Sequence, residues 1–235
     1  MIRVLFQGDS ITDGNRYKDP QNRWDLNHQI GHSYVFNVVG ALGRRFPGKY
    51  AFINRGVSGD TVEKIAARWQ QDTIDEKPDV LSLLLGINGN GSFDGAYPEG
   101  TETHLQNFER GYRELLKTVR EENPDLKIIL VEPFALPVGN LKPNYGKFTQ
   151  VFRRKQEIIR KIAEEFGADR AVRGGGVDVQ NAATDGKLAG AFHHAASGVA
   201  GSGQIADQLV DGIFAAGFQR ESCVHQGDPR HGALA

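Results

Sequence analysis

The sequence predicts an α/β protein built on a doubly wound parallel sheet with helices on both faces. Two observations support this fold class. Short apolar segments typical of strands alternate along the chain with longer segments whose apolar residues recur at helical spacing. Residues 80–85 (VLSLLL) form a nearly continuous apolar run, as expected of a central parallel strand buried on both faces. The 235 residues are 39% hydrophobic, enough for one sizeable core, so a single domain over residues 1–218 is expected.

The strands and helices alternate in order along the chain. Strands are expected at 1–5, 50–53, 80–85 and 127–131. Helices are expected at 33–46 with Ser33 as N-cap, from residue 60 with Asp60 and Glu63 at cap spacing, at 101–122, at 148–166, and through Ile205 to Phe214.

Three segments do not fit this regular alternation. Residues 13–32 are polar and irregular, and we interpret them as one wall of a substrate cleft. Residues 173–203 are rich in Gly and Ala and predict a poorly packed loop region. Residues 219–235 have no apolar period and predict a disordered tail.

The composition excludes several classes of partner. The 28 basic and 29 acidic residues are interspersed, so we expect a neutral or weakly charged small molecule rather than nucleic acid or an anionic membrane. Cys223 is the single cysteine, which excludes an intrachain disulfide or a thiolate metal cluster. No segment reads as a signal peptide or a membrane span, so a cytoplasmic location is expected. The oligomeric state stays open, and a homo-oligomer is compatible with the sequence.

A serine directly follows the first predicted strand. Residues 6–14 (FQGDSITDG) end that strand with Gly, Asp and Ser, which places Ser10 where open α/β sheets bind their ligands. This is a suitable position for a nucleophile. The alternative is a simple turn or helix cap, since Gly-Asp-Ser is a common composition for both.

Two further segments end strands at the same edge of the sheet. They are residues 54–60 (NRGVSGD) and 86–91 (GINGNG), and they contribute Gly59 and Asn88. Acyl transfer requires a nucleophilic oxygen and hydrogen-bond donors for the oxyanion, and a backbone N–H and an Asn amide can supply those donors. Singly, Gly59 is better explained as a glycine near a helix cap, and Asn88 as a residue that tolerates left-handed turn geometry. Their joint placement with Ser10 favours a site.

These three segments resemble the first three sequence blocks of the SGNH/GDSL hydrolases. Residues 67–69 (ARW), 77–79 (KPD) and 132–134 (EPF) resemble segments of the bacterial, carbohydrate-esterase-like members, and the resemblance runs from Met1 to about Gly167. It implies a flavodoxin-like three-layer α/β/α fold with a five-stranded parallel sheet and no cofactor. It also implies that Ser10 is the nucleophile and that the N–H groups of Ser10 and Gly59 and the side chain of Asn88 form the oxyanion hole.

The family's last block, an Asp-x-x-His run, has no direct match in this chain. In that block the histidine takes the serine proton and the aspartate orients the imidazole. Matching residues 200–206 to the family pattern puts Ala196 at the histidine position and His193 at the aspartate position. The third block is altered as well, since Gly89 stands where the family usually has Asp.

Two interpretations of this departure stay open. In the first, the loop is rearranged, and His194 or His193 acts as the base with Asp185 or Asp178 as the orienting acid; His194 is marginally preferred. In the second, the base is missing, and the protein is a weak or inactive esterase.

The sequence therefore predicts a serine esterase that removes a short acyl group such as acetyl from an alcohol, with a carbohydrate as the expected substrate. The alternative is a catalytically impaired member that binds an acylated sugar. No metal is expected, because His28, His32 and His104 make no metal pattern with nearby carboxylates. Arg68 is expected either to hold the loop over Ser10 or to be solvated, and Trp69 is expected in the core.

Overall fold

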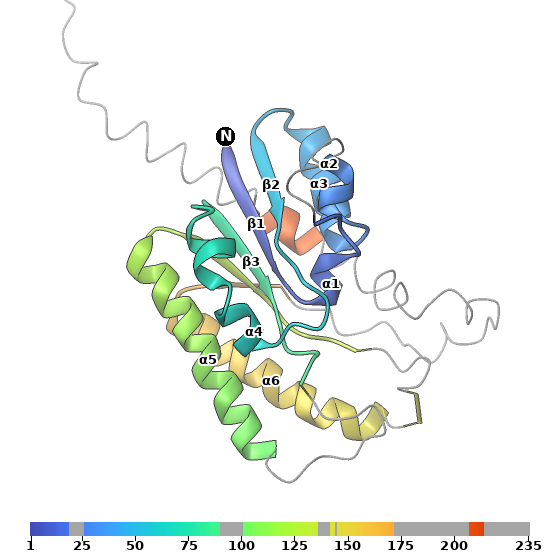
Figure 1. The fold of residues 1–235 in the computed structure, drawn as a ribbon, viewed down its shortest axis with the longest axis vertical. Helices are drawn as coiled ribbons and strands as arrows, with labels where there is room; N and C mark the ends of the chain where they lie inside the picture. Colours follow the sequence, from blue (N-terminus) through green and yellow to red (C-terminus); the bar gives the residue numbers. More distant parts are fainter. Residues whose placement is uncertain (19–25, 90–100, 136–141, 144, 172–206, 214–235) are drawn as a thin grey trace, which may run out of the picture.

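The computed structural model describes residues 1–18, 26–89, 101–135, 142–143, 145–171 and 207–213. These residues form a five-stranded sheet in the order β2-β1-β3-β4-β5, and every neighbouring pair is parallel. The strands are β1 (Ile2–Gly8), β2 (Tyr50–Asn54), β3 (Val80–Leu84), β4 (Lys127–Val131) and β5 (Asp169–Ala171). Helices cover both faces (Figure 1), so the predicted three-layer α/β/α fold is confirmed.

Helices connect the strands. They are α1 (Ser10–Asp13), α2 (Leu26–Ile30), α3 (Tyr34–Arg45), α4 (Val62–Ala66), a π-helical turn η1 (Gln70–Ile74), α5 (Thr101–Glu122) and α6 (Tyr145–Glu165). A further helical segment spans 207–213. No helix among the described residues is long and apolar enough to cross a membrane.

The core consists of two apolar layers on opposite faces of the sheet. The period-two alternation of β1 explains both layers, because Val4 and Phe6 belong to one and Leu5 to the other. The layer we call the α3 face includes Val35, Val38, Leu42, Leu209, Val210 and Ile213. The layer we call the α5 face includes Ile65, Trp69, Phe108, Tyr112, Leu116, Ile159 and Ile162. Trp69 is thus a core residue, as predicted.

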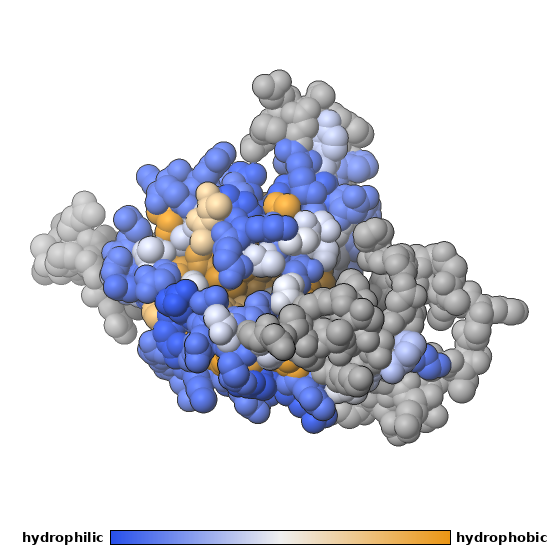
Figure 2. Space-filling view, turned by 60° about the horizontal axis from the view of Figure 1, so that its bottom comes forward, coloured by the Kyte–Doolittle hydropathy of each residue, from blue (hydrophilic) through white to orange (hydrophobic). Residues whose placement is uncertain are grey.

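The register of the sheet brings the strand ends together. Phe6 pairs with Asn54 at the end of β2, and Gly8 pairs with Leu84 at the end of β3. The segments that follow these three strands therefore leave the sheet at the same edge. Figure 2 turns the lower end of Figure 1 toward the viewer, and hydrophilic side chains dominate the described surface there, with hydrophobic ones visible between them.

Several expected elements differ from those observed. The helix after Gly59 was expected to use Asp60 and Glu63 as its cap, but α4 begins at Val62 with Thr61 as N-cap and no side-chain cap hydrogen bond. This prediction was wrong because the Asp60 carboxylate instead pairs with Arg68. The polar segment 13–32, predicted to be irregular, contains α2.

The other boundaries agree closely with the sequence. Helix α5 has the predicted bounds, α6 begins three residues before the predicted start at 148, and Ser33 caps α3 by accepting a hydrogen bond from the Val35 N–H. The predicted loop region 173–203 and the predicted tail 219–235 lie outside the described residues.

Candidate active site

Ser10 is the first residue of α1, immediately after the carboxyl end of β1. Asp9 caps this short helix, because its Oδ1 accepts a hydrogen bond from the Ile11 N–H at 3.0 Å. Gly14 ends the helix in the left-handed conformation. Ser10 is half-buried, whereas Asp9 is completely buried. The serine thus lies on a sharp strand-to-helix turn, at a fixed position relative to the sheet.

The segment after β2 is hydrogen-bonded directly to this turn. The Val57 N–H donates to Gly8 O at 3.0 Å, and the Ser58 N–H donates to Asp13 Oδ2 at 2.9 Å. Close packing accompanies these bonds, since a Cβ at Gly56 would lie 2.4 Å from the Asp13 backbone nitrogen. Gly59 follows with φ of +82°, a conformation that side chains rarely adopt.

The segment after β3 is in turn bonded to the segment after β2. The Asn88 Nδ2 donates to Asp60 O at 2.8 Å, which fixes the orientation of the carboxamide next to Gly59. The segments that carry Ser10, Gly59 and Asn88 therefore lie together at one edge of the sheet, as predicted. Their roles as nucleophile and oxyanion donors stay predictions.

Arg68 links the second segment to the first strand. Its guanidinium pairs with Asp60 Oδ2 at 2.7 Å and with Asp72 Oδ2 at 2.7 Å, and its Nη2 donates to Gln7 Oε1 at 2.8 Å. Arg68 was expected either to hold the loop over Ser10 or to be solvated. The structure favours an anchoring role, but the loop that Arg68 anchors is the one that contains Gly59. These partners could not be predicted from the sequence, because they depend on tertiary contacts.

Two buried ionisable groups at the site were missed by the sequence reasoning. Burial raises the pKa of Asp9 to about 7, and Asp9 Oδ2 has no hydrogen-bond partner among the described residues. Burial lowers the pKa of Lys155, on α6, to about 8. A signal existed for Lys155, since it lies four residues after Val151 and four before Ile159, on the apolar face of its helix.

The predicted general base cannot be located in this structure. His193, His194, Asp185 and Asp178 all lie outside the described residues. Another imidazole, His104 at the start of α5, packs beside Gly89: a Cβ at that glycine would lie 3.1 Å from His104 Cε1. Within the described ranges, no group of three or more His, Cys, Asp or Glu side chains is placed to hold a metal ion.

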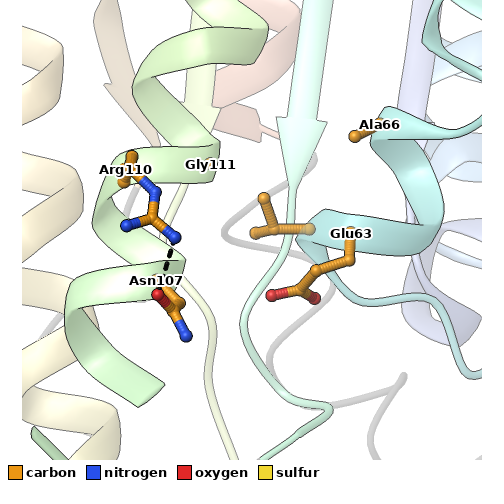
Figure 3. Close-up of a pocket in the computed structure, with 6 residues that line it drawn as sticks. Glu63, Ala66, Asn107, Arg110 and Gly111 are labelled. Carbon is orange, nitrogen blue, oxygen red and sulfur yellow. Dashed lines mark hydrogen bonds between the residues drawn. The ribbon is translucent and has the colours of Figure 1, made fainter. Parts of the chain in front are cut away.

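A groove of about 360 Å³ lies between α4 and α5, and its lining shares no residue with the three segments. Glu63 on α4 points across it toward Asn107 and Arg110 on α5, where the Arg110 Nη2 donates to Asn107 Oδ1 at 2.8 Å (Figure 3). None of the residues predicted to carry the chemistry lines this groove.

A parallel three-layer fold with a serine on the first strand-to-helix turn is typical of serine ester hydrolases, and this chain is one. It belongs to the GDSL-like lipase/acylhydrolase family, whose model matches residues 6–199.

Similar proteins include ones from Geobacillus stearothermophilus and Parabacteroides merdae. The chain is 34% identical over 166 residues to an acetylxylan esterase of Geobacillus stearothermophilus, covering 69% of this chain and 72% of that protein. A crystal structure of an acetylxylan esterase from that organism matches with a TM-score of 0.60 and 25% identity, over 92% of this chain and 94% of the other. A putative GDSL-like lipase from Parabacteroides merdae matches with a TM-score of 0.68 and 30% identity, over 90% of this chain and 94% of the other.

The solved structures of the Geobacillus acetylxylan esterase include three catalytic mutants. In these, a serine, an aspartate and a histidine are each replaced by alanine.

Proposed function

We propose that this protein is a serine esterase that releases short acyl groups, acetyl in particular, from hydroxyl groups of carbohydrates. The similarity to an acetylxylan esterase supports the carbohydrate and the acetyl group. The observation that carries the mechanism is the set of hydrogen bonds that joins the Ser10, Gly59 and Asn88 segments at one edge of the sheet.

In the proposed reaction, Ser10 Oγ attacks the ester carbonyl and transfers its proton to a histidine. The N–H groups of Ser10 and Gly59 and the Asn88 amide stabilise the negative charge on the carbonyl oxygen. The tetrahedral intermediate collapses as the histidine protonates the leaving sugar alcohol, which leaves an acyl-enzyme. Water, deprotonated by the same histidine, then attacks the acyl-enzyme. The bond to Ser10 Oγ breaks, the histidine returns the proton to Oγ, and the carboxylic acid is released. We propose His194 or His193 as this base, with Asp185 or Asp178 orienting it.

A fluorophosphonate probe and 4-nitrophenyl acetate test the first step. The wild-type protein is expected to be labelled at Ser10 and to hydrolyse the ester, whereas Ser10→Ala should lose both the label and at least about 10³-fold of the activity. Thr118→Ala is the matched control, since it also removes a hydroxyl and should keep the activity. Thr118 is exposed near the C-terminal end of α5, where the chain leads into the start of β4, at the sheet edge opposite Ser10. A wild-type protein that neither reacts with the probe nor hydrolyses the ester would contradict the proposal.

The base is tested with separate alanine variants of His194 and His193. The variant that lacks the base should lose at least about 10³-fold of its turnover and keep its thermal unfolding temperature. Acetylated xylo-oligosaccharides, used as substrates of the wild-type protein, test the carbohydrate specificity. If neither variant loses activity, the base lies elsewhere in the chain.

The sequence favours one second candidate function, because matching residues 200–206 to the family pattern puts Ala196 at the position of the catalytic histidine. This candidate is an impaired family member that binds an acylated sugar without cleaving it. Saturable binding of acetylated xylo-oligosaccharides with no ester turnover would support it. Hydrolysis that disappears in Ser10→Ala would exclude it.

A further inference from the structure

A fully buried lysine contacts the segment after β3, which carries Asn88. Lys155 is on α6 and has no solvent-exposed side-chain surface. Its hydrogen-bond partners among the described residues are two backbone oxygens rather than a carboxylate: Nζ donates to Gly86 O and to Asn88 O, both at 3.2 Å. The ammonium also lies 4.8 Å from the centroid of the Phe108 ring.

The two carbonyls belong to the segment whose shape decides where the Asn88 side chain points. Gly86, with φ of +128°, and Gly89, with φ of +74°, flank Asn88 in conformations that side chains rarely adopt. The Lys155 stem packs against Gly86, where a Cβ would lie 3.6 Å from Lys155 Cδ. Lys155 therefore holds the backbone of this turn through its carbonyls. The carboxamide of Asn88 is held separately, by its hydrogen bond to Asp60 O at 2.8 Å.

Burying the ammonium group of Lys155 costs desolvation free energy, so a lysine at this position is expected to have a specific role. A Met or Leu would fill a similar volume without the desolvation penalty, and replacing buried charges by apolar residues is often stabilising. A lysine provides what an apolar residue cannot, because it donates to the Gly86 and Asn88 carbonyls, and hydrogen bonds from a charged donor are stronger than those from a neutral one.

We infer that Lys155 is a positioning residue for the proposed oxyanion hole, holding the Gly86–Asn88 backbone so that the Asn88 amide meets the oxyanion. The inference rests on the proposed function of Asn88. It concerns transition-state stabilisation, because the oxyanion forms only after Ser10 attacks. Substrate binding in the ground state does not depend on it.

Lys155→Met tests the inference, because it keeps the length of the side chain and removes the donors. Loss of an oxyanion donor costs about 10² to 10³ in kcat, and a displaced donor keeps part of its effect, so we expect kcat to fall about 10- to 100-fold. The KM for 4-nitrophenyl acetate should change less than about twofold. Lys161→Met, an exposed lysine on the same helix, is the matched control and should keep wild-type kinetics.

The Asn88→Ala background separates positioning from a general loss of structure. If Lys155 acts through Asn88, adding Lys155→Met to Asn88→Ala should lower kcat by less than about threefold. An equal loss in both backgrounds would overturn the inference, as would a folded Lys155→Met protein with near wild-type kcat. Lys155→Gln replaces the methionine variant if the latter does not fold.

The wild-type pH profile gives a test that needs no variant. Asp9, Glu63 and His104 are the titratable groups that interact with Lys155 from the β1–α1 junction, α4 and α5. Since burial lowers the pKa of Lys155 to about 8, its hold on the two carbonyls weakens above that pH, and kcat should fall. A kcat that stays constant from pH 7 to 9.5 would overturn the inference. Absence of both probe labelling and ester turnover in the wild type would instead overturn the proposed function, and this inference with it.

Discussion

Asp9 stands next to the proposed nucleophile and is buried with only part of its hydrogen-bonding capacity used. Its Oδ1 caps α1, whereas Oδ2 has no partner among the described residues. The charged form therefore loses hydration that the protein does not fully replace, and burial raises the pKa of Asp9 to about 7. Between about pH 4 and pH 7, the folded protein therefore keeps a proton on Asp9 that the unfolded chain, in which this carboxyl has the ordinary pKa of 3.8, has already released.

This difference predicts the pH dependence of stability in an Asp9→Asn variant. In the wild type, the cost of ionising Asp9 is absent below about pH 4, grows as the pH rises, and is fully present above about pH 7. Asparagine keeps the capping oxygen and does not ionise. We therefore expect the free energy of unfolding of Asp9→Asn, relative to wild type, to increase by about 1–3 kcal/mol from pH 5 to pH 8.

Urea denaturation at the two pH values measures this change. Asp125→Asn, at an exposed aspartate, is the control and should show almost no change relative to wild type. A difference between Asp9→Asn and wild type that is the same at pH 5 and pH 8 would contradict the prediction.

At the scale of elements, the active-site edge depends on close packing between α1 and the segment after β2. Gly56 makes this contact, since a Cβ there would lie 2.4 Å from the nitrogen and 2.9 Å from the Cα of Asp13, both backbone atoms. Asn54 adds hydrogen bonds across the same contact, because its Nδ2 donates to Thr12 O and to Ile30 O, both at 2.8 Å. The position of Ser10 therefore depends on the position of the segment after β2.

Gly56→Ala should accordingly destabilise the protein and displace α1. Since neither backbone can yield without moving the turn, we expect a loss of about 1–3 kcal/mol in the free energy of unfolding and a lower kcat. Gly40→Ala is the control: this exposed glycine lies inside α3 with no atom within 4 Å of an added Cβ. It should stabilise the protein by about 0.5–1 kcal/mol. Chemical denaturation of the two variants measures both free energies of unfolding. An unchanged stability in Gly56→Ala would contradict the prediction and show that the turn can accommodate the added Cβ.

Elements with a strong local pattern could be predicted from the sequence, and those defined by tertiary contacts could not. Helix α5 has the predicted type because its apolar period matches its buried face, and strand β3 because its continuous apolar run is buried along its whole length. Strand β5 was not located, because it is a three-residue edge strand in which Asp169 and Arg170 are exposed. The Ser10, Gly59 and Asn88 segments were predicted because each follows a strand directly. Lys155 was missed because, although its spacing puts it on the apolar face of α6, a lysine is ordinarily expected to reach solvent, and its two carbonyl partners come from tertiary contacts.

At the scale of the whole molecule, the sheet joins two apolar layers that share no side chains. The α3 face is closed by the helical segment 207–213, where Leu209 and Ile213 are fully buried. Trp69 lies in the other layer, the α5 face, and its Nε1 donates to Thr118 Oγ1 at 3.0 Å. A mutation on one face and a fluorescent reporter on the other can therefore show whether the two layers unfold together.

Leu209→Ala is expected to destabilise both layers equally. Removing this side chain leaves a cavity on the α3 face and should cost about 2–5 kcal/mol. Because both layers are built on the same five strands, the protein should unfold in one cooperative transition. In a Trp24→Phe background, Trp69 is the single remaining tryptophan, and its fluorescence should report the same shift in urea midpoint as far-UV circular dichroism. A Trp69 transition that stays at the midpoint of the Trp24→Phe protein, while the circular dichroism signal shifts, would mean that the α3 face unfolds independently of the α5 face.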